Sequence, residues 1–144
     1  MAFPAAVPGL VIRYSYLWQT DYLRGQEEGV KDRPCAVILV TRNDEGEEMV
    51  TVLPITHSPP DNPALALEIP SGTKTRLGLD SERSWVILTE ANRFAWPGPD
   101  LRPVGGNLDS VAYGLLPQAF FNQAKERFVA ILRAGQARAV SRTE

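Results

Sequence analysis

Cysteine and histidine are almost absent from this chain of 144 residues, which contains one of each. The lone cysteine, Cys35, excludes an intrachain disulfide, and such scarcity is typical of a reducing compartment. With His57 as the single histidine, the chain also lacks the four Cys or His ligands of a structural zinc site. No apolar run approaches the roughly 18 residues of a membrane span, and the N-terminus lacks the basic start of a signal peptide. We therefore expect a cytoplasmic protein without a metal, a cofactor or a membrane contact.

A strong charge of either sign is also missing, because 15 Lys and Arg stand against 17 Asp and Glu. The net charge of −2 excludes a protein whose whole surface binds a polyanion, but it leaves room for a local phosphate site. Lysine is scarce, with three residues against twelve arginines, whose planar forks of donors suit phosphate and carboxylate groups. The alternative explanation of the excess of arginine is the base composition of the genome. A hydrophobic content of 44% is ordinary for a globular protein, and the length predicts one domain over residues 1–144.

Short strands are predicted along most of the chain from β-branched and aromatic runs between turn residues. These strands cover residues 10–16, 35–40, 49–55, 64–70 and 84–90. The second and third form a hairpin, because a polar tip with four acidic residues separates two apolar runs. The stretch 18–33 is predicted as a long polar loop, 71–80 as holding a single helical turn, and 92–106 as a short extended piece followed by turns.

One convincing helix follows the strands, beginning near Pro117 and ending before Gly135. Its apolar stripe recurs every three to four residues, at Phe120, Ala124, Phe128 and Ile131. Residues 136–144 show no periodicity and are expected to fray, so the folded core covers about residues 9–134. Five to seven short strands before one helix predict an α+β or mainly β fold, or a small β-barrel with a helix packed on it.

Two polar clusters are expected to meet at one end of the hairpin. Arg33 lies where the long loop becomes the buried strand, and there a guanidinium can offer a phosphate two hydrogen bonds from a rigid support. Thr56, His57 and Ser58 follow the returning strand and supply two hydroxyls and the only imidazole. If the hairpin is in register, Thr56 lies beside Arg33. The alternatives are an exposed arginine and a hydroxyl that caps the strand end.

A third polar cluster follows the strand at 84–90. Glu90 and Arg93 could reach the same edge of the sheet, or they could form a surface ion pair of little energy.

Two rival functions remain open. A nucleophilic pair of Cys35 and His57 would make a hydrolase, although a cysteine at the start of a buried strand is generally inert. A non-catalytic module would instead bind a peptide through aromatic side chains, namely Tyr14, Tyr16, Trp18 and Trp96.

Three segments together resemble the MazF/PemK family, the endoribonuclease toxins of bacterial toxin–antitoxin modules. They are KDRPCAVILV (31–40), VLPITHS (52–58) and SWVILTEANRF (84–94), and the likeness extends over about residues 9–134. The motifs PITHSPP and NRFAWPGPDLRP make the chain similar to a PemK-like branch. The resemblance implies a small SH3-like barrel with helices, usually a homodimer. It also implies metal-independent cleavage of single-stranded RNA and an antitoxin protein that blocks the site.

The resemblance assigns roles residue by residue. Arg33 matches the family's catalytic arginine, Thr56 its catalytic hydroxyl, and Glu90 an acid that some members use. Leu88 departs from the pattern, because some members have an arginine there. His57 is the other candidate for the general base, since an imidazole accepts a proton near neutral pH. The alternative is a catalytically inactive member of the family, which would bind RNA or a peptide without cleaving it. The remaining expected RNA contacts are Ser58, Arg93, Lys31 and Trp18.

Overall fold

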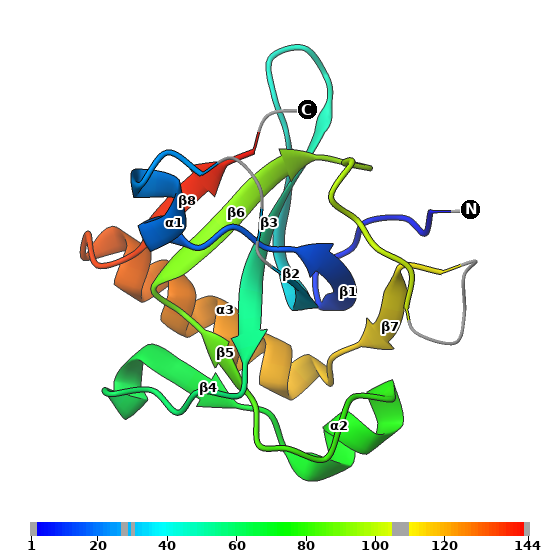
Figure 1. The fold of residues 1–144 in the computed structure, drawn as a ribbon, viewed down its shortest axis with the longest axis vertical. Helices are drawn as coiled ribbons and strands as arrows, with labels where there is room; N and C mark the ends of the chain where they lie inside the picture. The colour runs from blue at the N-terminus through cyan, green and yellow to red at the C-terminus, as the bar shows by residue number, and fades with distance from the viewer. Residues whose placement is uncertain (1–2, 27–28, 30, 105–109, 143–144) are drawn as a thin grey trace.

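A long antiparallel hairpin of strands β2 (Asp32–Arg42) and β3 (Glu48–Thr56) is the centre of the fold in the computed structural model. The structure describes residues 3–26, 29, 31–104 and 110–142. Apolar side chains fill the middle of both strands, so the hairpin is buried there and reaches solvent at its polar tip. Figure 1 shows this tip projecting beyond the rest of the molecule. The hairpin predicted from the sequence is confirmed, with each strand longer than its apolar run.

Six further strands extend this hairpin into one sheet among the described residues. They are β1 (Leu10–Ser15), β4 (Ala66–Glu68), β5 (Trp85–Ile87), β6 (Glu90–Ala95), β7 (Ala112–Leu115) and β8 (Arg138–Ser141). The main order is β4-β5-β3-β2-β1-β7, while β6 pairs with β3 and β8 pairs with β6. The pairings are antiparallel except that of β6 with β8, and the sheet is not closed. The chain is thus a small α+β domain of mainly β character, with eight strands where the sequence predicted five to seven.

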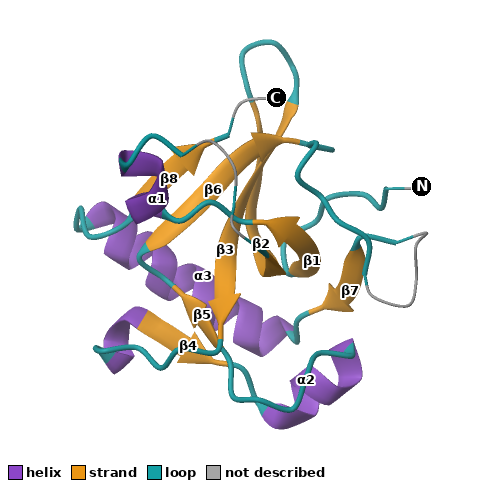
Figure 2. Ribbon diagram, in the orientation of Figure 1, coloured by secondary structure: helices purple, strands orange, loops and turns teal. Residues whose placement is uncertain are grey.

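Three α-helices and one 3-10 turn accompany the sheet in the described part of the chain (Figure 2). They are α1 (Gln19–Leu23), the 3-10 turn η1 (Pro63–Leu65), α2 (Ser71–Leu77) and α3 (Gln118–Arg133). α3 is the helix predicted after Pro117, and Gly135 follows its end at a φ of +74°, which glycine adopts without strain. α1 lies inside the stretch predicted as a loop at 18–33, and α2 is longer than the single turn predicted within 71–80.

The two faces of the sheet bury separate apolar clusters, because successive side chains of a strand point to opposite faces. One face packs against α3 through residues that include Val11, Leu53 and Phe128. The other face buries Ile12 and Val52 together with the aromatic rings of the early strand and β6. Figure 1 shows α3 passing behind β5 and β6, on the first of these faces. The long central strands therefore contribute to both clusters.

Residues 84–90 do not form one strand, which corrects the prediction from the sequence. β5 ends at Ile87 and β6 begins at Glu90, and both strands pair with β3. Between them Leu88 is fully buried, and its N–H donates to the carbonyl oxygen of Leu65 at 3.0 Å, away from β3. The extended piece predicted at 92–106 begins inside β6, and its residues 105–106 lie outside the described residues. No strand was predicted in the segment that forms β7.

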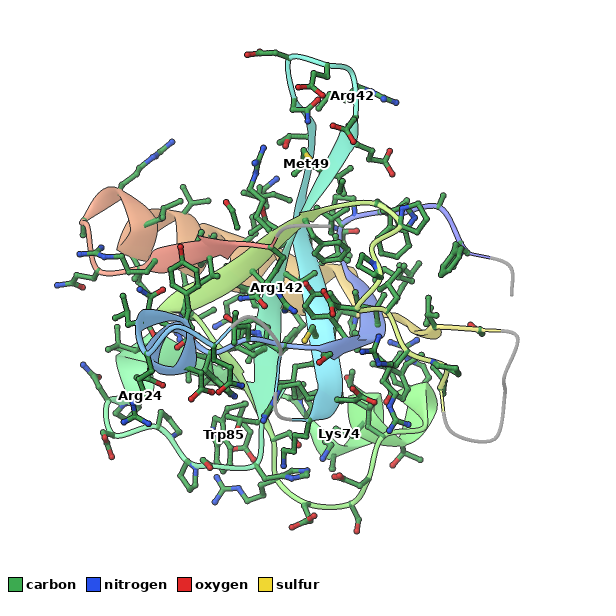
Figure 3. The ribbon with its side chains drawn as sticks, turned by 45° about the horizontal axis from the view of Figure 1, so that its top comes forward. Arg24, Arg42, Met49, Lys74, Trp85 and Arg142 are labelled. Atoms are coloured by element: carbon green, nitrogen blue, oxygen red, sulfur yellow. The ribbon has the colours of Figure 1, made fainter. Side chains whose placement is uncertain are left out.

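The C-terminal segment forms a strand, whereas residues 136–144 were predicted to fray; of these, 143–144 lie outside the described residues. β8 pairs in parallel with β6, and Val140 is buried. Beyond β8, the Arg142 guanidinium donates to the carbonyl oxygen of Ser15 at 2.8 Å and forms an ion pair with Asp100 at 3.0 Å. Figure 3 shows Arg142 in the middle of the molecule. The prediction was wrong because the order of this segment comes from a partner strand and buried ion pair, which its own periodicity does not reveal.

Replacing Arg142 with alanine should lower the free energy of unfolding by about 3 kcal/mol, because it leaves the largely buried Asp100 carboxylate and other buried acceptors unpaired. Urea unfolding followed by tryptophan fluorescence measures the change. Arg133→Ala, in the exposed last turn of α3, is the matched control and should shift stability by no more than about 0.5 kcal/mol. Equal stabilities of the two variants would contradict a stabilising role for the C-terminal segment.

Candidate active site

The end of the hairpin opposite its tip brings Arg33 and Thr56 together. β2 and β3 pair Cys35 with Pro54, and the same register continued by two residues sets Arg33 opposite Thr56. Because alternate residues share a face, both side chains lie on the face of the sheet that buries Cys35. Both also line one cavity with a volume of about 590 Å³. The hairpin register therefore places a guanidinium and a hydroxyl at one site, as expected from the sequence.

This cavity gathers most of the side chains that were singled out from the sequence. Eight residues were expected to catalyse cleavage or to contact RNA. Six of them line the cavity, namely Trp18, Lys31, Arg33, Thr56, His57 and Ser58. Glu90 and Arg93 are not among its lining residues. Its cationic lining residues are Arg13, Lys31, Arg33 and Lys74, whereas its acidic ones are Asp32 and Asp80. The cavity is therefore positively charged, although the whole chain has a net charge of −2.

The Arg33 side chain keeps unused hydrogen-bonding capacity. Its guanidinium carbon lies 4.8 Å from the centre of the Trp18 ring, which makes a cation–π contact. Its Nε is buried and has no hydrogen-bond partner among the described residues. Burial lowers the pKa of the Arg33 guanidinium from its ordinary value, but a guanidinium remains protonated in proteins. A guanidinium that lines a cavity without an ion-pair partner among the described residues favours binding of an anion such as a phosphate.

Thr56 presents its hydroxyl from the last position of β3. Its Oγ1 accepts a hydrogen bond from the backbone N–H of Ser58 at 3.1 Å, which is the strand-end turn that the sequence left open as an alternative. This bond uses a lone pair of the oxygen, so the hydroxyl hydrogen can still be donated to an oxygen atom in the cavity. Capping the strand end and binding a ligand are therefore compatible roles for Thr56.

Glu90 holds the segment that carries Trp18. Its Oε1 accepts hydrogen bonds from the Tyr16 hydroxyl at 3.1 Å and from the backbone N–H of Gln19 at 3.0 Å. Burial raises the pKa of Glu90 above its ordinary value, and these two hydrogen bonds act in the opposite direction. Glu90 does not line the cavity. Through its hydrogen bonds to Tyr16 and Gln19 it holds the residues on both sides of Trp18, whose ring packs against the Arg33 guanidinium.

Arg93 lies on the opposite face of β6 from Glu90. Residues three positions apart on a strand point to opposite faces, so the expectation that these two side chains reach one edge of the sheet is wrong. Arg93 pairs with Thr51 of β3 and with Ser141 of β8, in the middle of the sheet. Its backbone carbonyl accepts a hydrogen bond from the Arg142 N–H at 2.8 Å. An RNA contact by Arg93 therefore has no support from the cavity.

The His57 imidazole belongs to a hydrogen-bonded cluster next to Thr56. Its Nε2 lies 2.8 Å from Asp80 Oδ2, and its Nδ1 lies 3.8 Å from Glu82 Oε2. The Lys74 ammonium binds the other oxygen of Asp80 at 2.7 Å, and this hydrogen bond is the main cause that holds the pKa of Asp80 below its ordinary value. Sequence reasoning missed Lys74 and Asp80, since a lysine in a short polar helix gives no sign of burial.

The same cluster contains the one group of possible metal ligands found among the described residues. His57, Asp80 and Glu82 offer ligand atoms that all lie within 4.8 Å of one another. However, the Lys74 ammonium already contacts the Asp80 carboxylate at 2.7 Å and supplies the positive charge there. We therefore assign no metal to this group, and chemistry without a metal stays a prediction.

The two rival sites are not assembled in this structure. Cys35 is fully buried, burial raises the pKa of its thiol, and it does not line the cavity that contains His57. Tyr14 and Tyr16 are also fully buried, and the Tyr14 ring stacks on Phe94 at 4.6 Å within the core. The Cys–His pair and the exposed aromatic face for a peptide therefore both lack their key side chains.

A search against models of known protein families and a search of curated proteins both find no match to this chain. Among the described residues, no helix has the length and the apolar character needed to cross a membrane. Function is therefore inferred from the fold, from the cavity and from the sequence motifs that line it.

Cys35 should resist thiol reagents in the native protein, because its thiol is fully buried and burial raises its pKa. Iodoacetamide should modify the native chain at least about 100-fold more slowly than the chain unfolded in urea. Mass spectrometry of timed samples measures both rates, and Cys35→Ala controls for modification at other residues. Rapid modification of the native protein would restore the Cys–His alternative.

Proposed function

We propose that this chain is a sequence-selective endoribonuclease toxin that cleaves single-stranded RNA without a metal ion, as its resemblance to the MazF/PemK family implies. The observation that carries the proposal is a cavity that is lined by both Thr56 and Arg33, whose guanidinium has no ion-pair partner within 4 Å among the described residues. A mainly antiparallel sheet packed on α3 is compatible with the family's SH3-like barrel, which we propose as the architecture. We further propose a cytoplasmic homodimer that inhibits growth until an antitoxin protein covers this cavity.

The cavity has the size and the chemistry that a nucleotide chain requires. Its volume of about 590 Å³ lies within the range of roughly 300–1,000 Å³ that is usual for ligand sites. Trp18 places an aromatic ring beside the Arg33 guanidinium, and such rings stack on bases with about 1–3 kcal/mol per base. Lys31 and Ser58 are exposed at the cavity, where they can contact phosphate oxygens.

The acidic hairpin tip does not oppose RNA binding at this site. Arg33 lies near the start of β2, whereas the acidic residues of the tip follow Arg42 at its end. At about 3.3 Å per residue, the strand separates the two by about 30 Å, which exceeds the roughly 8 Å Debye length at physiological salt. Figure 3 shows Arg42 at the tip and Lys74, near the cavity, at opposite ends of the molecule.

RNA carries the nucleophile for this reaction in its 2′-hydroxyl. Attack of the 2′ oxygen on the adjacent phosphorus forms a 2′,3′-cyclic phosphate and releases a 5′-hydroxyl. The Arg33 guanidinium stabilises the negative charge that develops on the phosphate oxygens, and the Thr56 hydroxyl donates to one of them. His57 accepts the proton of the 2′-hydroxyl, because it lines the cavity and Glu90, the other candidate, does not.

Arg33→Ala should reduce the turnover of RNA cleavage by about 10² or more, the scale expected for loss of one preorganised donor. The protein is incubated with a defined single-stranded RNA in EDTA, and the fragment ends are identified. Arg93→Ala is the matched control, since it removes an arginine that lies outside the cavity, and should keep nearly full activity. Cyclic phosphate ends that disappear in Arg33→Ala would support the proposal.

Two results of this experiment would overturn the proposed reaction. Full activity of Arg33→Ala in EDTA would remove the arginine from the site. Binding of RNA by the wild-type protein without any cleavage would leave the alternative of a non-catalytic RNA-binding barrel.

RNA binding should depend only modestly on salt, because only two of the cations that line the cavity, Arg33 and Lys31, have no ion-pair partner within 4 Å among the described residues. Two phosphate contacts at about 0.7 each predict a slope of log affinity against log salt near −1.4. Lys31→Ala should reduce that slope by about 0.7, whereas Lys125→Ala, on the exposed side of α3, should leave it unchanged. Fluorescence anisotropy with a 2′-O-methyl oligonucleotide measures the slope, and equal slopes for both variants would contradict a Lys31 contact.

A further inference from the structure

We propose that Asp80, anchored by Lys74, is a positioning residue that fixes the tautomer and the orientation of the His57 ring for proton transfer. This inference deepens the proposed ribonuclease function and rests on it. Three side chains from separate segments meet here: His57 follows β3, Lys74 lies in α2, and Asp80 follows α2. All three line the cavity that contains Arg33 and Thr56.

Lys74 is a buried cation whose hydrogen-bonding capacity is fully used. Its side chain is 4% exposed, and an ammonium has three N–H donors. These donors meet Asp80 Oδ1 at 2.7 Å, Ser84 Oγ at 2.7 Å and the backbone carbonyl of Glu82. No donor of Lys74 is left for a phosphate, although the residue lines the cavity. Its role is therefore to hold Asp80 in place.

Asp80 is held through one carboxylate oxygen and presents the other to His57. Its Oδ1 accepts from the Lys74 ammonium and from the backbone N–H of Glu82 at 3.1 Å. Its Oδ2 lies 2.8 Å from His57 Nε2. The ammonium lowers the pKa of Asp80, so the carboxylate is ionised and can only accept hydrogen bonds. Two donors thus fix a side chain that is half-exposed and would otherwise rotate.

An ionised Asp80 decides which nitrogen of the His57 ring carries the hydrogen. Because the carboxylate only accepts, the contact of 2.8 Å requires the hydrogen on Nε2. In the neutral ring Nδ1 then has the lone pair and is the atom that can take a proton. Glu82 Oε2, at 3.8 Å from Nδ1, lies where it stabilises the imidazolium that results.

The proton transfer can be written with every atom placed. Nδ1 of His57 takes the hydrogen of the RNA 2′-hydroxyl while the 2′ oxygen forms a bond to phosphorus. The bond from phosphorus to the 5′ oxygen breaks, and a water molecule protonates that oxygen. The hydroxide so formed removes the proton from the imidazolium and restores the neutral ring. Asp80 touches none of the reacting atoms and acts only through the ring that it holds.

The tautomer can be measured directly, because His57 is the only histidine in the chain. Nitrogen NMR of protein labelled with ¹⁵N-histidine should show, for the neutral ring of the wild type, only the Nε2–H tautomer. Asp80→Asn should give a mixture of both tautomers, since an amide can donate as well as accept. Asp44→Asn, at the exposed hairpin tip, is the matched control and should keep the wild-type spectrum.

The kinetic test asks whether Asp80 acts through His57. Asp80→Asn should lower kcat for RNA cleavage by about 10–100-fold with little change in KM, a smaller loss than the 10²–10⁴ or so expected for His57→Ala. In the double variant, Asp80→Asn should add no further loss to that of His57→Ala. An additional loss would overturn the inference, since Asp80 would then act independently of the ring.

The spectra and the kinetics separate failure of this inference from failure of the proposed function. A wild-type ring protonated on Nδ1, or a spectrum of Asp80→Asn that equals the wild type, would overturn the positioning role whether or not RNA is cleaved. If the wild-type protein cleaves no RNA, the proposed function fails, and the spectra alone decide whether Asp80 positions His57. The wild-type spectrum needs no substitution, so a variant that fails to fold does not prevent the test.

Discussion

The register between β2 and β3 is the constraint on which the core and the cavity both depend. A slip of one residue would turn every side chain of one strand to the other face of the sheet. The pairing of Cys35 with Pro54 buries the cysteine, and two residues further along it sets Arg33 opposite Thr56. The burial of apolar side chains in the middle of the hairpin thus stabilises the arrangement of polar side chains at its end.

Buried cations organise the parts of the molecule that the hairpin does not reach. Arg142 joins the C-terminal strand to β1 through the Ser15 carbonyl, and to the turn after β6 through Asp100. Lys74 does the same at the cavity, where it binds Asp80 and the loop after α2. An unpaired buried cation is costly, so each one selects a single arrangement of its partners. Arg33 differs from both, because it lines the cavity and has no ion-pair partner within 4 Å among the described residues.

The elements that could be predicted were those whose order is local. The apolar runs around the acidic tip predicted the hairpin, and the spacing of Ala124 and Phe128 with Pro117 and Gly135 predicted α3 and both of its ends. The errors concern segments whose structure depends on a distant partner. The tail at 138–141 becomes a strand because β6 offers it an edge, and residues 84–90 are interrupted where Leu88 turns toward Leu65. The sequence of each of these segments contains no pattern that indicates its distant partner.

The sequence by itself determined that a central hairpin forms and that its end brings the segments of Arg33 and Thr56 together, because two apolar runs flank a polar turn. The exact register was decided by the tertiary structure, since the pairing shifts between Val37 and Leu39, and this shift sets Arg33 opposite Thr56. Only the tertiary structure decided which partners the other polar side chains bind and which of these side chains are buried. Glu90 is committed to Tyr16 and Gln19, because the side chains of two segments about 70 positions apart pack together there. Lys74 is buried and aims Asp80 at His57, which no local pattern indicates. Burial and partner choice are properties of the packed chain, since both are set by segments that are distant in the sequence.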